Sequence, residues 1–240
     1  MLRQYDEIIQ RVLADLQKEL QSDLLGILLV GSVAYGIPGP HSDIDLFAVI
    51  RPSWRQRRMF VVNDIEVEVF LNPVQQVRTE FQMFDAPSTI SMFAQGRILS
   101  DPEGVVQQLV QEAQHIWQQP RPAVNSAMYD RLRYAPLDLL KDAQDLLDVD
   151  EEAAIMVMIA ALHATADAYY KVHRLWPVAP KKQLQDMETH NSELGQLMRS
   201  ILSYGLTIHE RYDALSVFVD RVLEPIGGRM NEWYTPRESV

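Results

Sequence analysis

A glycine–serine pair and two closely spaced aspartates are the residues of this chain best suited to chemistry. Gly31 and Ser32 follow an apolar stretch, and Asp43 and Asp45 flank a single isoleucine further along. A glycine turn after a strand offers backbone N–H groups, and serine adds a hydroxyl, so the pair suits phosphate oxygens. Aspartates at positions i and i+2 of a strand point to one face, as a divalent cation requires. The pattern predicts a metal–nucleotide site.

Each half of this pattern also has a structural explanation. Ser32 is a good N-cap for a helix that follows a strand. The two aspartates would be ordinary on a solvated edge strand, but the apolar residues 46–49 indicate burial. Two carboxylates on one face of a buried strand repel each other and need a counter-charge. Mg²⁺ binds carboxylate oxygens, so we expect Asp43 and Asp45 to be metal ligands.

A third carboxylate is predicted on a neighbouring strand. Residues 65–71 alternate between apolar and other side chains, which places Glu66 and Glu68 on one face. A carboxylate there is able to ligate a metal ion or to act as general base on an attacking hydroxyl. The alternative is the solvated face of an amphipathic strand. Glu68 is favoured over Glu66 because it lies farther from the turn at Asn63 and Asp64.

The first half of the chain is predicted to contain both the helices and the strands that position these residues. Apolar residues have helical spacing over 5–20 and again, irregularly, over 74–95. Short apolar or alternating runs indicate the strands and hairpin. Those segments are 27–30, 44–50, the hairpin 58–71 and 97–99. The arginine-rich stretch 51–58 is expected to be a solvated loop.

The second half shows helical periodicity alone. A proline-containing stretch, 118–125, is the best domain boundary, and the segments expected to be helical after it are 126–147, 150–173, 180–187, 191–204 and 206–225. We therefore predict an α+β protein: a small mixed β-sheet domain with flanking helices at 1–120 and an α-helical bundle at 121–240, with a cleft between them. The tail from Gly227 is expected to be loosely held.

Composition narrows the classes of partner and location. The 240 residues carry a formal net charge of −11, which disfavours long nucleic acid as a partner. The chain has no cysteine, so disulfides and thiolate chemistry are excluded. The N-terminus has no apolar signal core, and the most apolar run, Ala153–Leu162, is shorter than the roughly 20 residues that span a bilayer. We expect a cytoplasmic protein without a membrane partner.

At this point a family resemblance is visible. Gly-Ser-x-Ala-x-Gly, followed by Ser-Asp-Ile-Asp-Leu and a glutamate on a later strand, resembles the DNA polymerase β-like nucleotidyltransferase superfamily, and within it the bacterial aminoglycoside nucleotidyltransferases. The resemblance implies that Gly31, Ser32 and Ser42 bind the triphosphate. It implies that Asp43 and Asp45 bind Mg²⁺, and that Glu68 or Glu66 is a further ligand or the general base.

The second half resembles the helical bundle of the same enzymes. The likeness is greatest around Val178-Ala179-Pro180-Lys181. In such enzymes a lysine after a proline reaches the nucleotide phosphates. The resemblance assigns that role to Lys181, with Lys182 as the neighbouring alternative.

Together these residues imply a Mg²⁺-dependent enzyme that uses one or two metal ions. It would move a nucleoside monophosphate, AMP from ATP first of all, to a hydroxyl of a small acceptor and release pyrophosphate. An aminoglycoside-like antibiotic is the acceptor that the resemblance suggests. Two alternatives stay open: an antitoxin-type enzyme that adenylylates a protein, and a non-catalytic nucleotide-binding module. The NTP preference and the oligomeric state are left open.

Overall fold

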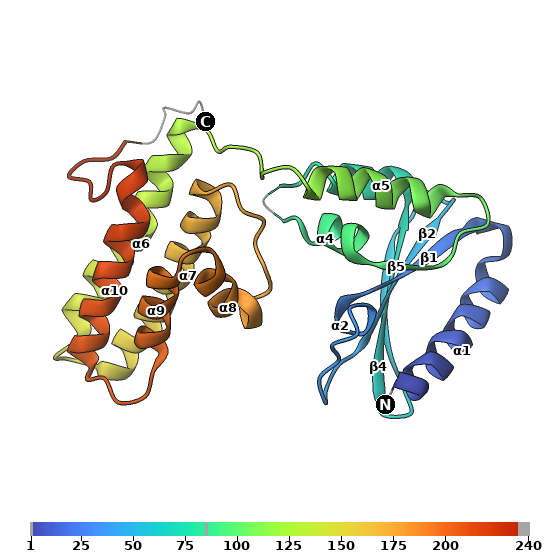
Figure 1. The fold of residues 1–240 in the computed structure, drawn as a ribbon, viewed down its shortest axis with the longest axis horizontal. Coiled ribbons are helices and arrows are strands. Elements are labelled where there is room, and N and C mark those ends of the chain that lie inside the picture. The colour runs from blue at the N-terminus through green and yellow to red at the C-terminus, as the bar shows by residue number, and fades with distance from the viewer. Residues whose placement is uncertain (1, 85, 235–240) are drawn as a thin grey trace. The chain divides into compact units, whose positions relative to one another are not determined.

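The computed structural model describes residues 2–84 and 86–234 of the chain. These residues divide into two compact units, Met1–Gln119 and Pro120–Val240. The first unit mixes strands and helices and the second is helical (Figure 1). The predicted α+β class is therefore confirmed.

The N-terminal unit is built on a five-stranded sheet with the strand order β3-β4-β2-β1-β5. The β2–β4 pair is parallel and the other neighbours are antiparallel. The strands are β1 (Leu24–Val30), β2 (Ile44–Ile50), β3 (Gln56–Val62), β4 (Ile65–Pro73) and β5 (Arg97–Ser100). The helices are α1 (Leu2–Leu20), the short α2 (Gly31–Ala34), α3 (Val74–Glu80), α4 (Ser88–Gln95) and α5 (Val105–Trp117).

Helices cover both faces of this sheet. The apolar stripe of α1 packs on the face that carries Ile44, Leu46 and Val67 (Figure 1). Helices α4 and α5 pack on the opposite face, where Phe47 meets Phe93 of α4 edge to face at 4.8 Å between ring centroids. Because side chains alternate along a strand, Asp45 lies on the same face as Phe47. The acidic residues therefore share the α4–α5 face of the sheet.

The hairpin between β3 and β4 corrects one expectation. Asn63 and Asp64 both have positive φ, 51° and 62°, as a two-residue type I′ turn requires. This turn pairs Val62 with Ile65 and, further along the same register, Arg57 with Phe70. The segment 51–58 is thus not entirely a solvated loop, because residues from Gln56 onward belong to the edge strand β3.

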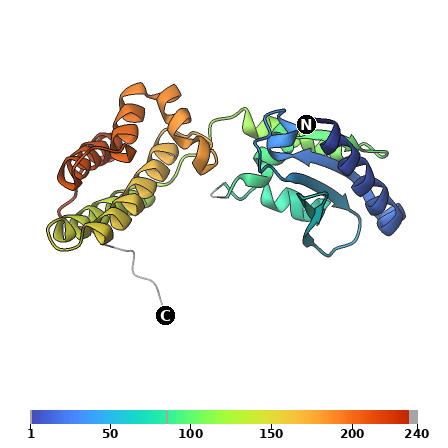
Figure 2. The ribbon, with the colours of Figure 1, turned by 90° about the horizontal axis from the view of Figure 1, so that it is seen from below.

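The C-terminal unit is a helical bundle with its own core. Its helices are α6 (Ser126–Leu146), α7 (Glu151–Val172), α8 (Pro180–His190), α9 (Ser192–Leu202) and α10 (Ile208–Leu223). The long helices α6 and α7 pack side by side (Figure 2), and α10 packs on α7. Side-chain caps explain where three helices begin: Asn125 caps α6, Asp150 caps α7, and Thr207 forms a capping box with Glu210 at α10.

Within the described residues, α7 is the one helix long and apolar enough to cross a membrane by length and composition. It extends the apolar run Ala153–Leu162 on both sides. Half of its most apolar window is buried inside the bundle, as in the core helix of a soluble protein. Ala154, Met158, Ala161 and Leu162 of this helix are fully buried, so packing within the bundle accounts for its composition.

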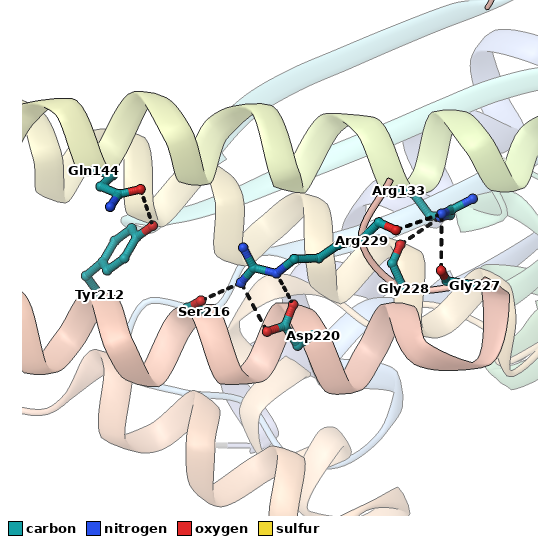
Figure 3. Close-up of polar contacts among 8 residues, drawn as sticks. All are labelled: Arg133, Gln144, Tyr212, Ser216, Asp220, Gly227, Gly228 and Arg229. Carbon is teal, nitrogen blue, oxygen red and sulfur yellow. Dashed lines mark hydrogen bonds and ion pairs between the residues drawn. The ribbon is translucent and has the colours of Figure 1, made fainter. Parts of the chain in front are cut away.

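The chain after α10 is better held than expected. The Arg133 guanidinium donates hydrogen bonds to the backbone carbonyls of Gly227, Gly228 and Arg229 (Figure 3). Arg229 in turn makes a two-point ion pair with Asp220 of α10, at 2.7 and 3.0 Å. The prediction of a loose tail is wrong for residues 227–229, because one arginine of α6 satisfies three carbonyls there.

Candidate active site

The glycine turn and one aspartate of the predicted site are in direct contact. Gly31 begins α2 directly after β1 and has a φ of +71°, a region that side chains other than glycine rarely adopt. A Cβ atom at this position would lie 2.1 Å from Oδ2 of Asp45. Val30 and Asp45 are register partners on β1 and β2, which explains the close approach. The missing side chain of Gly31 therefore makes the space that the Asp45 carboxylate occupies.

The two predicted serines are also brought together. The Ser32 hydroxyl donates a hydrogen bond of 2.9 Å to Oγ of Ser42, which accepts a second one, of 2.8 Å, from the backbone N–H of Gly39. Ser42 comes just before Asp43, so the loop 35–43 is tied back to the turn after β1. This loop returns the chain to β2 with both aspartates beside the Gly31–Ser32 turn.

The carboxylates form a row across two parallel strands. Asp45 of β2 is the register partner of Glu68 of β4. Glu66 precedes Glu68 by two positions on β4 and shares its face. Asp43 lies directly before β2 and lines one pocket together with Glu66. Among the described residues there is no group of three or more histidine, aspartate or glutamate side chains close enough to hold a metal ion. Asp45 and Glu68 thus lie opposite each other on neighbouring strands, but the described acidic side chains do not form a three-ligand metal site.

Arg57 is the residue of this region that the sequence reasoning missed. Its Nε donates a hydrogen bond of 2.5 Å to the carboxylate of Glu68, and its guanidinium carbon lies 5.0 Å from the ring centre of Phe70. The hydrogen bond and charge of Glu68, together with the charge of Asp45, raise the pKa of Arg57. A fixed cation therefore borders the carboxylate row from the edge strand β3.

Tyr35 borders the row from the other side. Burial raises the pKa of its phenol, and the negative charge of Asp45 raises it further, while a hydrogen bond with Ser91 acts in the opposite direction. The phenol is therefore neutral at physiological pH and adds no charge beside Asp45. The sequence offered no signal for this contact, since Tyr35 lies in a loop and Ser91 in α4.

Two pockets lie at opposite ends of the row. The acidic pocket, of about 530 Å³, includes Asp43, Glu66, Asp64 and His41 in its lining. The arginine pocket, of about 510 Å³, includes Arg55, Arg57, Phe47, Phe70, Asn72 and Glu80 in its lining. Glu68 has Glu66 two positions before it and Phe70 two positions after it on β4, so this strand connects the two pockets.

The lysines predicted to contact phosphate lie in the other unit. Lys181 and Lys182 are exposed in the first turn of α8, directly after Pro180 at the first helical position. The backbone N–H of Lys182 donates to the carbonyl of Ala179. Their local structure agrees with the proline–lysine pattern, and their role towards the nucleotide stays a prediction.

A strand, a glycine turn, a serine and an Asp-x-Asp strand in this arrangement define a nucleotidyltransferase-type domain. Comparison with known families agrees: residues 9–99 match the sequence model of the nucleotidyltransferase domain. Residues 9–99 therefore form a nucleotidyltransferase domain, and the chain is a nucleotidyltransferase. A comparison with curated proteins finds no match.

Solved structures support the fold. A nucleotidyltransferase-like protein from Exiguobacterium sibiricum matches with a TM-score of 0.55 over 90% of this chain and 74% of its own. The two sequences are 14% identical, so this likeness concerns the fold alone. Each unit is about half of the chain, so an alignment that covers 90% of the chain includes residues of both units.

Proposed function

We propose that the chain transfers a nucleoside monophosphate from a nucleoside triphosphate, with ATP as the first candidate, to a hydroxyl of a small acceptor. The observation that carries this proposal is the contact between the Gly31 turn and the Asp45 carboxylate. That contact puts backbone N–H groups suited to phosphate beside a carboxylate suited to a divalent cation. A triphosphate with its cation needs both at once.

The residues present fit Mg²⁺. This ion is usually held by one or two carboxylates together with waters and substrate phosphates, so a three-ligand protein cage is not needed beforehand. Asp43 and Asp45 would be its protein ligands, with Glu68 as a further ligand for one of two ions. Bound Mg²⁺ would neutralise phosphate charge in this site. Asp43 is half-buried and lines the acidic pocket, which leaves room for such a complex.

The reaction follows from the placement of the other groups. The acceptor hydroxyl oxygen attacks the α-phosphorus and forms the new P–O bond, while the bond to the bridging oxygen of the β-phosphate breaks and pyrophosphate leaves with that electron pair. Glu68 accepts the hydroxyl proton, with Glu66 as the alternative base. Ser32, Ser42 and the turn amides hold the triphosphate, and Lys181 or Lys182 would contribute a further positive charge. Positioning and charge neutralisation supply most of the rate.

Arg57 gives Glu68 a defined position before substrate binds. The charge-assisted hydrogen bond between them holds the carboxylate in place. We propose Arg57 as a positioning residue that acts through Glu68.

Calorimetric titration of ATP, with and without Mg²⁺, tests this function. We expect Mg²⁺-dependent binding by the wild type and its loss in Asp45→Asn, where a neutral amide replaces the carboxylate beside Gly31. Asp15→Asn is the matched control, since Asp15 is exposed on α1 on the opposite face of the sheet, and it should bind like the wild type. Failure of ATP, GTP, CTP and UTP alike to bind the wild type would contradict the proposal.

A further inference from the structure

The arginine pocket has a floor and two walls of different chemistry. Phe47 and Phe70 form the floor as a stacked pair, with ring centres 5.9 Å apart. Arg55 and Arg57 form one wall, from the end of the 51–55 loop and from β3. The other wall comes from α3 and α4, which contribute Glu80 and Met92 among other residues. A pocket of about 510 Å³ has the size of a small-molecule site, and here an aromatic floor is bordered by polar walls.

Asn72 is the polar residue of the pocket floor. Its residue is 8% exposed, and its side chain points to the same face as Phe70 because it lies two positions further along β4. Among the described residues, the Asn72 amide group has no hydrogen-bond partner. The amide atoms retain solvent contact at the pocket surface, so they are open to water and to a ligand in the pocket.

The charge of the pocket is positive. Glu80 is the acidic residue of its described lining, and its carboxylate already accepts hydrogen bonds from Gln76 and Thr89, at 2.8 and 2.7 Å. Arg55 lies 3.9 Å from Glu80, which is a long ion pair. The terminal nitrogens of Arg57 make no hydrogen bond within the described residues, since its bond to Glu68 uses Nε. Guanidinium donors are therefore left to face the pocket.

On these grounds we propose that the arginine pocket binds the acceptor, and that this acceptor is a hydroxylated ring compound carrying an anionic group. Its ring would lie on Phe70, which stacks on the buried Phe47. Its anion would bind Arg55 and the free donors of Arg57, and Asn72 would hydrogen-bond to it. Glu68 lies next to this pocket on β4, so the acceptor hydroxyl would reach the proposed base. This inference rests on the proposed function. It excludes a polycation such as an aminoglycoside from this pocket, because two arginines repel it.

Binding of simple charged ring compounds to the full chain tests the inference. The probes are phenyl phosphate, phenylacetate and 2-phenylethylamine, which share a ring and differ in charge. Methionine methyl signals report where they bind: Met92 lines the pocket, and Met158 is buried in the C-terminal bundle. We expect both anions to shift Met92 at millimolar concentrations, at least tenfold more tightly than the amine, and to leave Met158 unchanged. The tighter of the two anions distinguishes phosphate from carboxylate chemistry.

Arginine variants separate the pocket from general surface charge. Arg55→Gln should weaken the binding of both anions about tenfold, the value of one charged hydrogen-bonded contact. Arg58→Gln is the matched control: Arg58 lies three residues further, on β3, and points to the other face, where it pairs with Glu19 of α1 at 2.7 Å. It should bind the anions like the wild type. Equal binding of the amine, no shift of Met92 with any probe, or equal weakening by both variants would overturn the inference.

Repeating the probe titrations in the presence of nucleotide separates this inference from the proposed function. Saturation with Mg²⁺ and a non-hydrolysable ATP analogue should leave the anionic probes bound, because the nucleotide occupies the Gly31 turn. Displacement of the probes would show that the pocket holds the nucleotide, and would overturn its assignment to the acceptor. Probe binding without nucleotide binding would instead contradict the proposed function. Nucleotide binding without probe binding would contradict the pocket alone.

Asn72→Leu distinguishes a ligand contact from a structural one. Leucine has nearly the same shape and removes an amide that makes no hydrogen bond within the described residues, so the free energy of unfolding should change little. Binding of the anionic probes should still fall severalfold. A fall in the free energy of unfolding with unchanged probe affinity would show that Asn72 serves the fold.

Discussion

The two ends of the carboxylate row have opposite charge. At the acidic pocket, the turn of the β3–β4 hairpin and the start of β2 bring together Asp43, Asp64 and Glu66. At the arginine pocket, four residues further along the same strands, the floor is aromatic and the wall carries Arg55 and Arg57. Asp45 and Glu68 lie between the two. The end from which the acceptor approaches therefore decides which molecules react.

This comparison also bears on the choice between the two glutamates. Glu66 lines the acidic pocket, whereas Glu68 is bound by Arg57, which lines the arginine pocket. A base must lie within hydrogen-bonding reach of the hydroxyl it deprotonates. An acceptor in the arginine pocket would thus use Glu68, and an acceptor in the acidic pocket would use Glu66.

The largest predicted effect is on kcat, and it tests whether Glu68 or Glu66 is the general base. Glu68→Gln should lower kcat for monophosphate transfer by about 10²–10⁴, the usual contribution of a general base. Glu66→Gln should lower kcat much less. Both changes remove one negative charge from the same strand, so each serves as the control for the other. Initial rates of pyrophosphate release measure both, and the reverse order of effects would move the acceptor to the acidic pocket.

Gly31→Ala tests the contact on which the proposed function rests. The new Cβ would collide with the Asp45 carboxylate, and we expect Mg²⁺-dependent ATP binding to fall at least tenfold. A residue with a side chain at this φ also costs about 1–2 kcal/mol of stability. Gly104→Ala is the matched control, because Gly104 has a φ of +72° and open space around it. It should show a similar loss of stability by thermal unfolding and no loss of ATP affinity. Equal ATP binding by the two variants would contradict the proposed role of the Gly31–Asp45 contact.

Much of this architecture was predictable because its signals are local. The alternation over 65–71 and the apolar run 46–49 each reflect burial on at least one side of a strand. Asn125 begins α6 as an N-cap, and Pro180 fixes the start of α8. The four acidic residues were identified for the same reason, since spacing by two on a strand determines the face. Their roles as metal ligands or base stay predictions.

Arg57 was missed because β3 carries no comparable signal. It is an edge strand, mostly exposed, and its first residues Gln56, Arg57 and Arg58 are all polar. Their sequence is typical of a loop. The usable signal lay in the turn: a two-residue Asn-Asp connection fixes the pairing of Val62 with Ile65, and the register then places Arg57 opposite Phe70. The Arg57–Glu68 contact follows from that register.

The smallest predicted effect concerns the acidic pocket. Asp64→Asn removes a charge from it and keeps a side chain that tolerates the positive φ of 62°. If polycations bound there, the loss of one exposed ion pair, worth about 0.2–1 kcal/mol, would weaken an aminoglycoside up to about fivefold. Because we place the acceptor in the arginine pocket, we expect only weak binding of kanamycin. Calorimetry should therefore give the same weak affinity for the wild type and for Asp64→Asn. The methyl signal of Ile65, which lines the acidic pocket, should stay unchanged. Tight binding that shifts Ile65, falls in Asp64→Asn and weakens with salt would assign the acceptor to the acidic pocket.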